Sequence, residues 1–93
     1  MSQPLFDRLA LIGIGLIGSS IARAARKHGL AKRIAIADSA VEARRIAQDL
    51  TLGDSFHADA VEAVKDADLV IVCVPIGAYA EVGQAIAPHL KPG

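Results

Sequence analysis

Residues 8–18 read RLALIGIGLIG, an apolar run whose second half carries three glycines. A continuous apolar run is typical of a strand that is covered on both faces, as in a parallel sheet. Residues 16–28 continue with the spacing of an amphipathic helix, and Gly29 stands where a left-handed residue ends a helix. The stretch therefore predicts a strand over residues 8–14 that passes through a glycine turn into a helix.

The rest of the chain alternates short apolar runs with amphipathic segments. Further strands are predicted over residues 33–37, 55–57 and 69–74, and further helices over residues 40–50, 61–65 and 78–90. Successive strands are far enough apart for crossover connections, which predicts a parallel sheet with helices on both faces. The predicted fold class is α/β, a Rossmann-like doubly wound parallel sheet with strand order 3-2-1-4. A complete sheet of this kind has six strands, so this one is expected to be truncated. The uncovered edge of its last strand is expected to pair with another chain or segment.

Apolar spacing and capping residues define the helices more closely. The buried face of the first helix is predicted to carry Ile17, Ile21, Ala24, Ala25 and His28. The buried faces of the second and last helices are predicted to carry Val41, Ala43, Ile46, Ala47 and Leu50, and Tyr79, Val82, Ile86 and Leu90, respectively. The predicted caps are Asp38 or Ser39 for the second helix and Asp59 for the third, with Gly53 ending the second.

Composition excludes several classes of protein. Ten basic residues balance ten acidic ones, which argues against binding to nucleic acid or to an anionic membrane. The single cysteine, Cys73, excludes an internal disulfide, and the scattered histidines do not have the spacing of a metal site. The apolar run at residues 9–18 is too short to span a bilayer. Its glycines and the basic helix after it are unlike a signal peptide, so a soluble cytoplasmic protein is expected.

The glycines at residues 13–18 follow the pattern G-x-G-x-x-G, between a predicted strand and a predicted helix. In that context the pattern indicates a dinucleotide site. Gly13 would permit the tight turn, Gly15 would let a diphosphate approach the backbone, and Gly18 would let the helix pack closely. Leu16 and Ile17 open the helix, where free N–H groups and the positive end of the dipole favour phosphates.

Asp38 stands at the end of the second predicted strand, about 20 residues after the last glycine of the motif. A carboxylate there, with Ser39 beside it, can accept hydrogen bonds from the ribose hydroxyls of adenosine and would repel a 2′-phosphate, which favours NAD over NADP. Arg44 and Arg45 are close enough to accommodate NADP instead, or they belong to a solvated helix face. In the alternative interpretation the glycines only form a turn and Asp38 only caps a helix.

The turn at Val74 and Pro75 follows the last predicted strand, at the sheet edge where ligands bind in open α/β folds. It either borders the nicotinamide half of the cofactor or simply ends the strand. Cys73 is predicted to be inert core. No catalytic or metal-binding role is assigned to His28, His57 or His89.

These motifs together resemble the N-terminal nucleotide-binding domain of the prephenate dehydrogenase family, which includes arogenate and cyclohexadienyl dehydrogenases. The resemblance covers nearly the whole chain, through residues 9–30 (LALIGIGLIGSSIARAARKHGL), 34–38, 67–75 (ADLVIVCVP) and 86–93 (IAPHLKPG). It implies that residues 1–93 are the incomplete dinucleotide-binding domain of an NAD-dependent prephenate or arogenate dehydrogenase, an enzyme of tyrosine biosynthesis.

The resemblance also implies a reaction and partners. NAD would take a hydride from the ring carbon that bears the substrate hydroxyl, and carbon dioxide would leave as the ring becomes aromatic. The family's catalytic histidine and its helical C-terminal domain follow the L-K-P-G segment, so the isolated chain is expected to have negligible turnover. A homodimer acting on a small molecule is expected. The alternatives are another nicotinamide oxidoreductase, of the β-hydroxyacid dehydrogenase or imine reductase type, and a non-catalytic NAD-sensing module.

Overall fold

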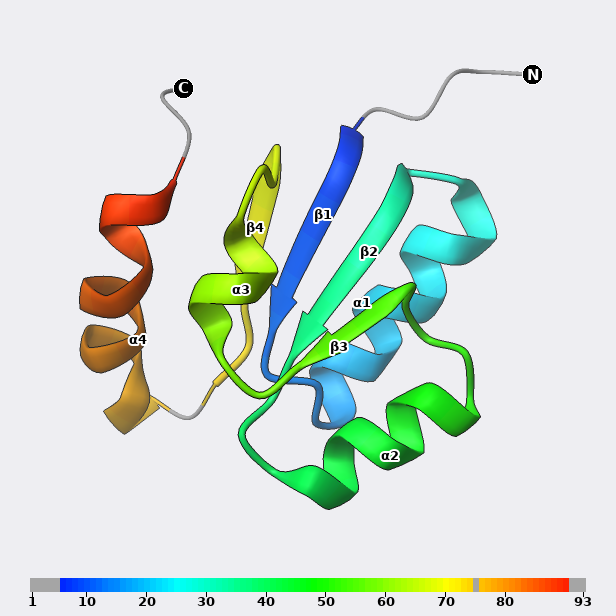
Figure 1. Ribbon diagram of the computed structural model, residues 1–93. Coiled ribbons are helices and arrows are strands. Elements are labelled where there is room, and N and C mark those ends of the chain that lie inside the picture. The colour runs from blue at the N-terminus through cyan, green and yellow to red at the C-terminus, as the bar shows by residue number, and fades with distance from the viewer. Residues whose placement is uncertain (1–5, 75, 91–93) are drawn as a thin grey trace.

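The computed structural model describes residues 6–74 and 76–90, in which strands and helices alternate along the chain (Figure 1). The strands are β1 (Phe6–Ile12), β2 (Ala31–Ala37), β3 (Ser55–His57) and β4 (Leu69–Val72). The helices are α1 (Leu16–His28), α2 (Val41–Asp49), α3 (Ala60–Val64) and α4 (Tyr79–Ile86), with 3₁₀ turns at Ile76–Ala78 and Ala87–His89. In this part of the chain, no helix combines the length and the apolar character that crossing a membrane requires.

All four strands are parallel, in the order β3-β2-β1-β4. Leu11 at the centre of β1 pairs with Ile36 of β2 on one side and with Ile71 of β4 on the other. The carboxyl ends of the strands therefore meet at one edge of the sheet (Figure 1). The predicted Rossmann-like fold and its 3-2-1-4 order are confirmed.

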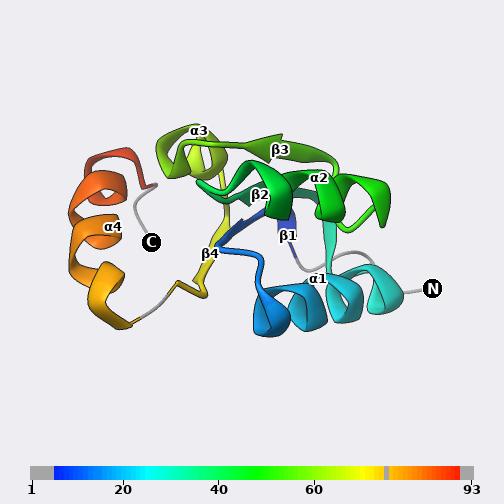
Figure 2. The same cartoon turned by 90° about the horizontal axis from the view of Figure 1, so that it is seen from below.

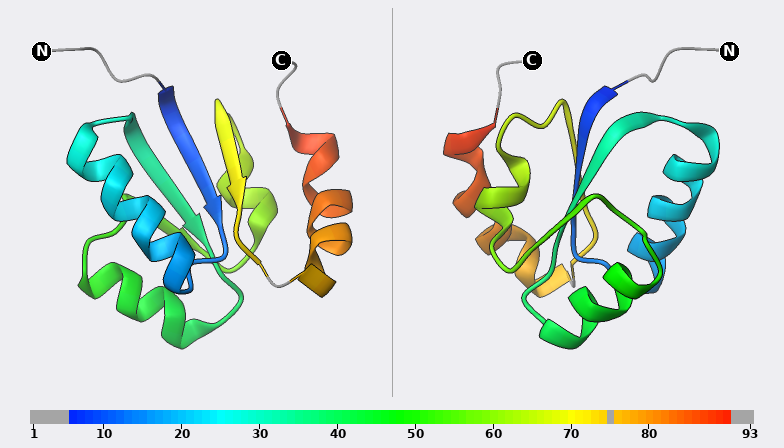
Figure 3. Two further views of the ribbon diagram at one scale, coloured as in Figure 1. Left: turned by 180° about the vertical axis from the view of Figure 1, so that it is seen from behind. Right: turned by 45° about the vertical axis from the view of Figure 1, so that its right-hand side comes forward.

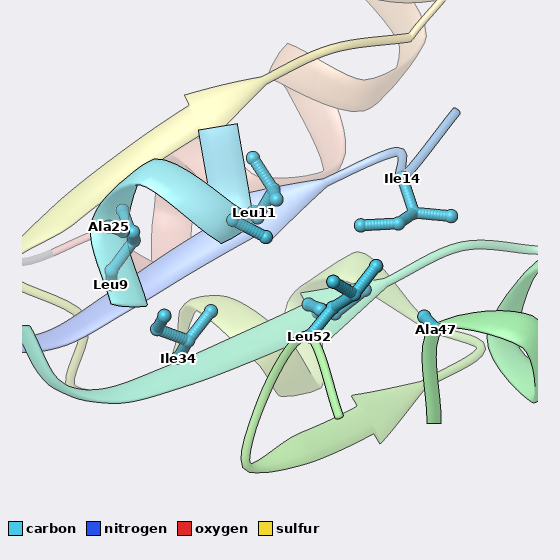
Figure 4. Packing of buried hydrophobic residues seen from close by; sticks show 9 residues of the cluster. Leu9, Leu11, Ile14, Ala25, Ile34, Ala47 and Leu52 are labelled. Atoms are coloured by element: carbon cyan, nitrogen blue, oxygen red, sulfur yellow. The ribbon is translucent and has the colours of Figure 1, made fainter. Parts of the chain in front are cut away.

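Helices cover both faces of the sheet, because side chains alternate between the faces along each strand. On the face towards α1 and α2, the strands contribute Leu9, Leu11, Ile34 and Ile36 to one buried cluster. Figure 4 shows this cluster, which also contains Ala25, Ala47 and Leu52. On the opposite face β1 and β2 carry mostly alanines. Ala10, Ala35 and Ala37, together with Ile12, pack there with Ala63 and Val64 of α3 and Ile86 of α4. Figures 2 and 3 show α1 and α3 on opposite sides of the sheet.

The face that α1 buries is shifted by one residue from the face predicted from the sequence. The helix buries Gly18, Ala22 and Ala25, whereas Ile17 is 72% exposed and Ala24 and His28 are exposed. Small side chains let the helix axis lie close to the sheet, so α1 packs through its smallest residues and not through its isoleucine at position 17. Ile21 is half-buried at the border of this face.

The other predicted helix faces were also partly wrong. On α2, Ala47 is buried and Ala43 half-buried, but Val41, Ile46 and Leu50 are exposed. The last helix was predicted as one segment, but α4 ends at Ile86 and a 3₁₀ turn follows it. Ile86 is buried, whereas Leu90, after the turn, is exposed. β4 ends at Val72, two residues before the predicted end, and β1 begins earlier than predicted, at Phe6.

Thr51, and not Gly53, adopts the left-handed conformation after α2, with a φ of 53°. The N–H groups of Thr51 and Leu52 donate to the carbonyls of Gln48 and Ala47, both at 3.0 Å, which closes the helix. Gly53 lies instead under Ile36, where a Cβ would approach the Ile36 side chain to 2.7 Å.

Within the described residues, the sheet ends at β4, which pairs only with β1. The Tyr79 hydroxyl at the start of α4 donates to the Val72 carbonyl at 3.1 Å and ties this helix to the end of the strand. Pairing of this strand with another chain or segment stays a prediction.

We expect Thr51→Gly to raise the free energy of unfolding by about 0.5–1 kcal/mol, since a β-branched residue in the left-handed region is strained and glycine is not. Urea unfolding measures the change. Gln48→Gly, at an exposed position inside the same helix, is the control and should lower the stability by about 1 kcal/mol. An unchanged or lower stability of Thr51→Gly would contradict the strain.

Candidate functional site

A cleft of about 920 Å³ opens at the carboxyl edge of the sheet, within the size range of ligand sites. The loops that follow all four strands and the beginning of α4 contribute to it. Its lining consists of Ile12, Gly13, Ile14, Gly15, Ile17, Ala37, Asp38, Ser39, Ala58, Asp59, Ala60, Cys73, Val74, Ala78, Glu81 and Val82.

Close packing requires a glycine at two positions, Gly13 in the turn after β1 and Gly18 in the first turn of α1. Gly13 has a φ of +87°, and a Cβ there would lie 2.8 Å from the carbonyl oxygen of Cys73. A Cβ on Gly18 would lie 2.5 Å from the carbonyl oxygen of Gly13. Because both obstacles are backbone atoms, which cannot move aside, these glycines fix the distance between α1, the turn and the end of β4.

Gly15 differs from these two glycines because its missing side chain faces open space. A Cβ there would meet no described heavy atom within 4 Å, and the residue is exposed at the N-cap of α1 with a φ of +22°. Its carbonyl accepts hydrogen bonds from the N–H and the hydroxyl of Ser19, whereas no side chain of the described residues caps the N–H groups that follow. The first turn of α1 also contains no acidic residue, so it can receive an anion.

The carboxylate of Asp38 joins the ends of β1 and β2. Its Oδ2 accepts the Ile14 N–H at 3.0 Å, and its Oδ1 accepts the Ala40 N–H at 2.9 Å. The side chain therefore lies against the glycine turn, half-buried, at the border of the cleft that Gly15 also lines. Each carboxylate oxygen has a second lone pair that can accept a further hydrogen bond. Ala40, and not Asp38 or Ser39, is the N-cap of α2.

The two arginines of α2 have different surroundings. The half-buried Arg44 donates from Nη1 to the carbonyl oxygens of Asp38 at 2.7 Å and Ser39 at 3.3 Å, which holds the loop after β2. Arg45 is exposed and forms an ion pair with Glu42. Its Nη2 donates a hydrogen bond to the Glu42 carboxylate, and this bond raises the pKa of Arg45. Neither arginine lines the cleft.

The structure brings most of the predicted site residues together. Gly13, Gly15, Ile17, Asp38, Ser39 and Val74 line the cleft, while Gly18 is buried behind the turn. Leu16 is the first residue of α1. Pro75 lies outside the described residues, as does the end of the L-K-P-G segment. Cys73, predicted to be core, is half-buried and borders the cleft.

One wall of the cleft was not predicted from the sequence. It consists of residues 58–60, where the loop after β3 enters α3, and of Ala78, Glu81 and Val82 around the start of α4. Asp59 was predicted as the cap of α3, and its Oδ1 does accept the Val61 N–H at 2.9 Å. The position of residues 58–60 after a parallel strand was the available signal, because ligands gather at that edge of a sheet.

Comparison with known proteins identifies the family of this chain. A family profile described as "Prephenate dehydrogenase, nucleotide-binding domain" matches residues 21–93. The chain belongs to this family. The cyclohexadienyl dehydrogenase of Zymomonas mobilis subsp. mobilis is 42% identical over 87 residues, which cover 94% of the chain and 30% of the relative. The chain thus spans about a third of the length of such relatives.

The chain is also similar to a reductase by sequence and to a solved structure by fold. The pyrroline-5-carboxylate reductase of Pseudomonas aeruginosa is 39% identical over 94 residues, covering 99% of the chain and 33% of that protein. A crystal structure of prephenate dehydrogenase from A. aeolicus, in complex with hydroxyphenyl propionate and NAD+, superposes with a TM-score of 0.82 at 21% identity. It covers 98% of this chain and 31% of the other, and at this identity it supports the prephenate dehydrogenase domain fold alone.

We expect Gly18→Ala to lower the free energy of unfolding by about 1–3 kcal/mol, because its Cβ would overlap the Gly13 carbonyl. Gly83→Ala is the matched control, since Gly83 lies in α4 with no described atom within 4 Å of a Cβ. This control should gain about 0.5–1 kcal/mol from helix propensity. Thermal and urea unfolding measure both variants, and equal effects would refute the close contact at Gly18.

Proposed function

We propose that the cleft binds NAD, and that residues 1–93 are the dinucleotide-binding domain of an NAD-dependent prephenate or arogenate dehydrogenase. The observation that carries the proposal is the position of the Asp38 carboxylate, which lies against the turn that presents Gly15. The N–H groups that would donate to the diphosphate and the carboxylate that would accept from the ribose thus lie at one cleft. Family membership and the identity to a cyclohexadienyl dehydrogenase support the same interpretation.

The diphosphate would lie at Gly15, where the backbone is exposed and no Cβ intervenes. The first N–H groups of α1, at Leu16 and Ile17, would donate to its oxygens, and the helix dipole favours its charge. The described residues that line the cleft include no lysine or arginine. Backbone groups, with Gly13 and Gly18 holding the turn in shape, would therefore carry phosphate recognition.

The ribose of the adenosine half would lie at Asp38 and Ser39, with its hydroxyls donating to the carboxylate. Three acidic residues line the cleft, Asp38, Asp59 and Glu81. A 2′-phosphate placed among them would be repelled, since no cationic group of the described lining would offset its charge. This supports NAD over NADP. Arg44 is directed instead to the backbone carbonyls of the loop.

Bound NAD supplies a nicotinamide ring that accepts a hydride from the substrate. Val74 and Pro75, after β4, would border that half of the cofactor. No residue of this chain is assigned to substrate binding or proton transfer, so the chain alone is expected to have negligible turnover. The complete protein would act on prephenate or arogenate by oxidative decarboxylation, as a cytoplasmic homodimer that binds neither nucleic acid nor membranes.

A different nicotinamide oxidoreductase is the second candidate, which the identity to a pyrroline-5-carboxylate reductase favours. A non-catalytic NAD-sensing module is the third. Turnover of prephenate or arogenate by the complete protein would separate the first candidate from the other two.

Gly15→Val is expected to abolish NAD binding in calorimetric titration, because its side chain would project into the space for the diphosphate. Circular dichroism and thermal unfolding verify that the variant still folds. Gly83→Val, outside the cleft on α4, is the matched control and should bind like the unmodified protein. Unchanged affinity of a folded Gly15→Val variant would refute the diphosphate site.

Asp38→Ala is expected to weaken NAD binding by about 1.5–3 kcal/mol, the usual strength of hydrogen bonds to a charged group, and to weaken NADP binding less. The decisive quantity is the ratio of the two dissociation constants, because the substitution also removes acceptors for Ile14 and Ala40. Asp49→Ala, at the exposed end of α2, controls for net charge. Equal losses for both cofactors would remove Asp38 from the ribose role.

A further inference from the structure

The side chain of Arg44 folds back from α2 onto the loop that carries Asp38. Its Nη1 donates to the carbonyl oxygens of Asp38 at 2.7 Å and of Ser39 at 3.3 Å, and the side chain is half-buried. Resting on the proposed function, we propose that Arg44 is a positioning residue for the ribose site. By holding the Asp38 carboxylate in its binding orientation, it sets the affinity for NAD and the preference for NAD over NADP.

A single peptide unit connects Arg44 with the Asp38 carboxylate. The Ser39 carbonyl and the Ala40 N–H belong to this planar unit, in which they point in opposite directions. Arg44 binds the unit at its carbonyl, and Oδ1 of Asp38 accepts its N–H at 2.9 Å. Because the unit is rigid, a rotation at the carbonyl end would also turn the N–H away from the carboxylate. The guanidinium and the carboxylate therefore hold each other through the backbone.

The other contacts of Asp38 hold it from the side of the sheet. Its N–H donates to the His57 carbonyl at 3.0 Å, which attaches the residue to the end of β3. Its Oδ2 accepts the Ile14 N–H at 3.0 Å, at the glycine turn. Arg44 instead holds the part of the loop that leads into α2. Loss of the guanidinium would free the peptide at Ala40 and weaken one of the two hydrogen bonds that orient the carboxylate.

Two observations separate this role from a direct contact with the cofactor. Asp38 and Ser39 line the cleft, whereas Arg44 does not. No carboxylate within residues 6–74 and 76–90 forms an ion pair with Arg44, so its charge serves the two carbonyls. Hydrogen bonds from a charged donor are roughly twice as strong as neutral ones, and a guanidinium stays charged at any ordinary pH. Arg44 is therefore expected to act on the cofactor through the loop.

The test is a double-mutant cycle between Arg44 and Asp38, with NAD and NADP as ligands in calorimetric titration. We expect Arg44→Met to raise the dissociation constant for NAD by about tenfold, because the carboxylate must then be ordered during binding. In the Asp38→Ala background the same substitution should change this constant by less than about twofold, since no carboxylate remains to be positioned. The dissociation constant for NADP should also change by less than about twofold, because Arg44 does not contact the 2′-phosphate.

Arg45→Met is the matched control. Arg45 is the next residue of the same helix, but it is exposed, pairs with Glu42 and lies outside the cleft. This variant should bind both cofactors like the unmodified protein. If Arg44→Met does not fold, Arg44→Lys replaces it in the cycle, because an ammonium can still donate to a carbonyl. We then expect a loss of about threefold in NAD affinity, which Asp38→Ala again removes.

Amide hydrogen exchange tests the positioning without any ligand. The Ala40 N–H, which donates to the Asp38 carboxylate, should exchange several-fold faster in Arg44→Met than in the unmodified protein. Arg45→Met should leave its exchange rate unchanged. An unchanged rate in Arg44→Met would show that the carboxylate keeps its place without the guanidinium, and would overturn the inference.

The outcomes of the titrations separate this inference from the proposed function. NAD affinity that is unchanged in Arg44→Met, or lowered equally with and without the Asp38 carboxylate, would overturn the positioning role and leave the NAD site standing. A loss of NADP affinity as large as the loss of NAD affinity would do the same, since Arg44 would then act on phosphate or on the whole fold. Failure of the unmodified protein to bind NAD would overturn the proposed function and this inference with it.

Discussion

The close contact between Gly18 and the Gly13 carbonyl is the constraint on which the site depends. With no Cβ at Gly18, the first turn of α1 can lie directly against the turn that leaves β1. The beginning of the helix is then held at the carboxyl edge of the sheet, with its unpaired N–H groups directed outwards. If α1 lay further from the turn after β1, its first N–H groups would no longer lie beside the other loops that border the cleft.

The second determinant is the Asp38 carboxylate, which has a structural role in addition to the chemical role proposed for it. By accepting N–H groups from Ile14 and Ala40 it connects the loops after β1 and β2, and Arg44 holds the second of these loops through its carbonyls. The carboxylate proposed to accept the ribose hydroxyls is thereby held in place by the chain itself. Such preorganisation lowers the entropy that binding must otherwise overcome.

The unequal faces of the sheet account for the position of the cleft. Large aliphatic side chains fill the space under α1 and α2, whereas alanines dominate the strands beneath α3 and α4. The short α3 and the start of α4 leave open space at the carboxyl edge on that side. Three acidic residues and no lysine or arginine of the described residues line this space, so the proposed phosphate recognition would depend on backbone N–H groups, and additional negative charge on a ligand would be disfavoured.

The sequence by itself determined the order of the elements, the parallel sheet and the glycine turn between β1 and α1. These follow from local patterns, namely continuous apolar runs, turn residues and the motif at residues 13–18. Only the tertiary structure decided which face α1 buries, that Thr51 and not Gly53 ends α2, and that Asp38 contacts Ile14. In an alanine-rich helix two adjacent faces have nearly equal apolar spacing, so close packing chooses between them. The wall formed by residues 58–60 and Glu81 joins segments far apart in the chain, and its geometry arises only when the sheet brings the strand ends together.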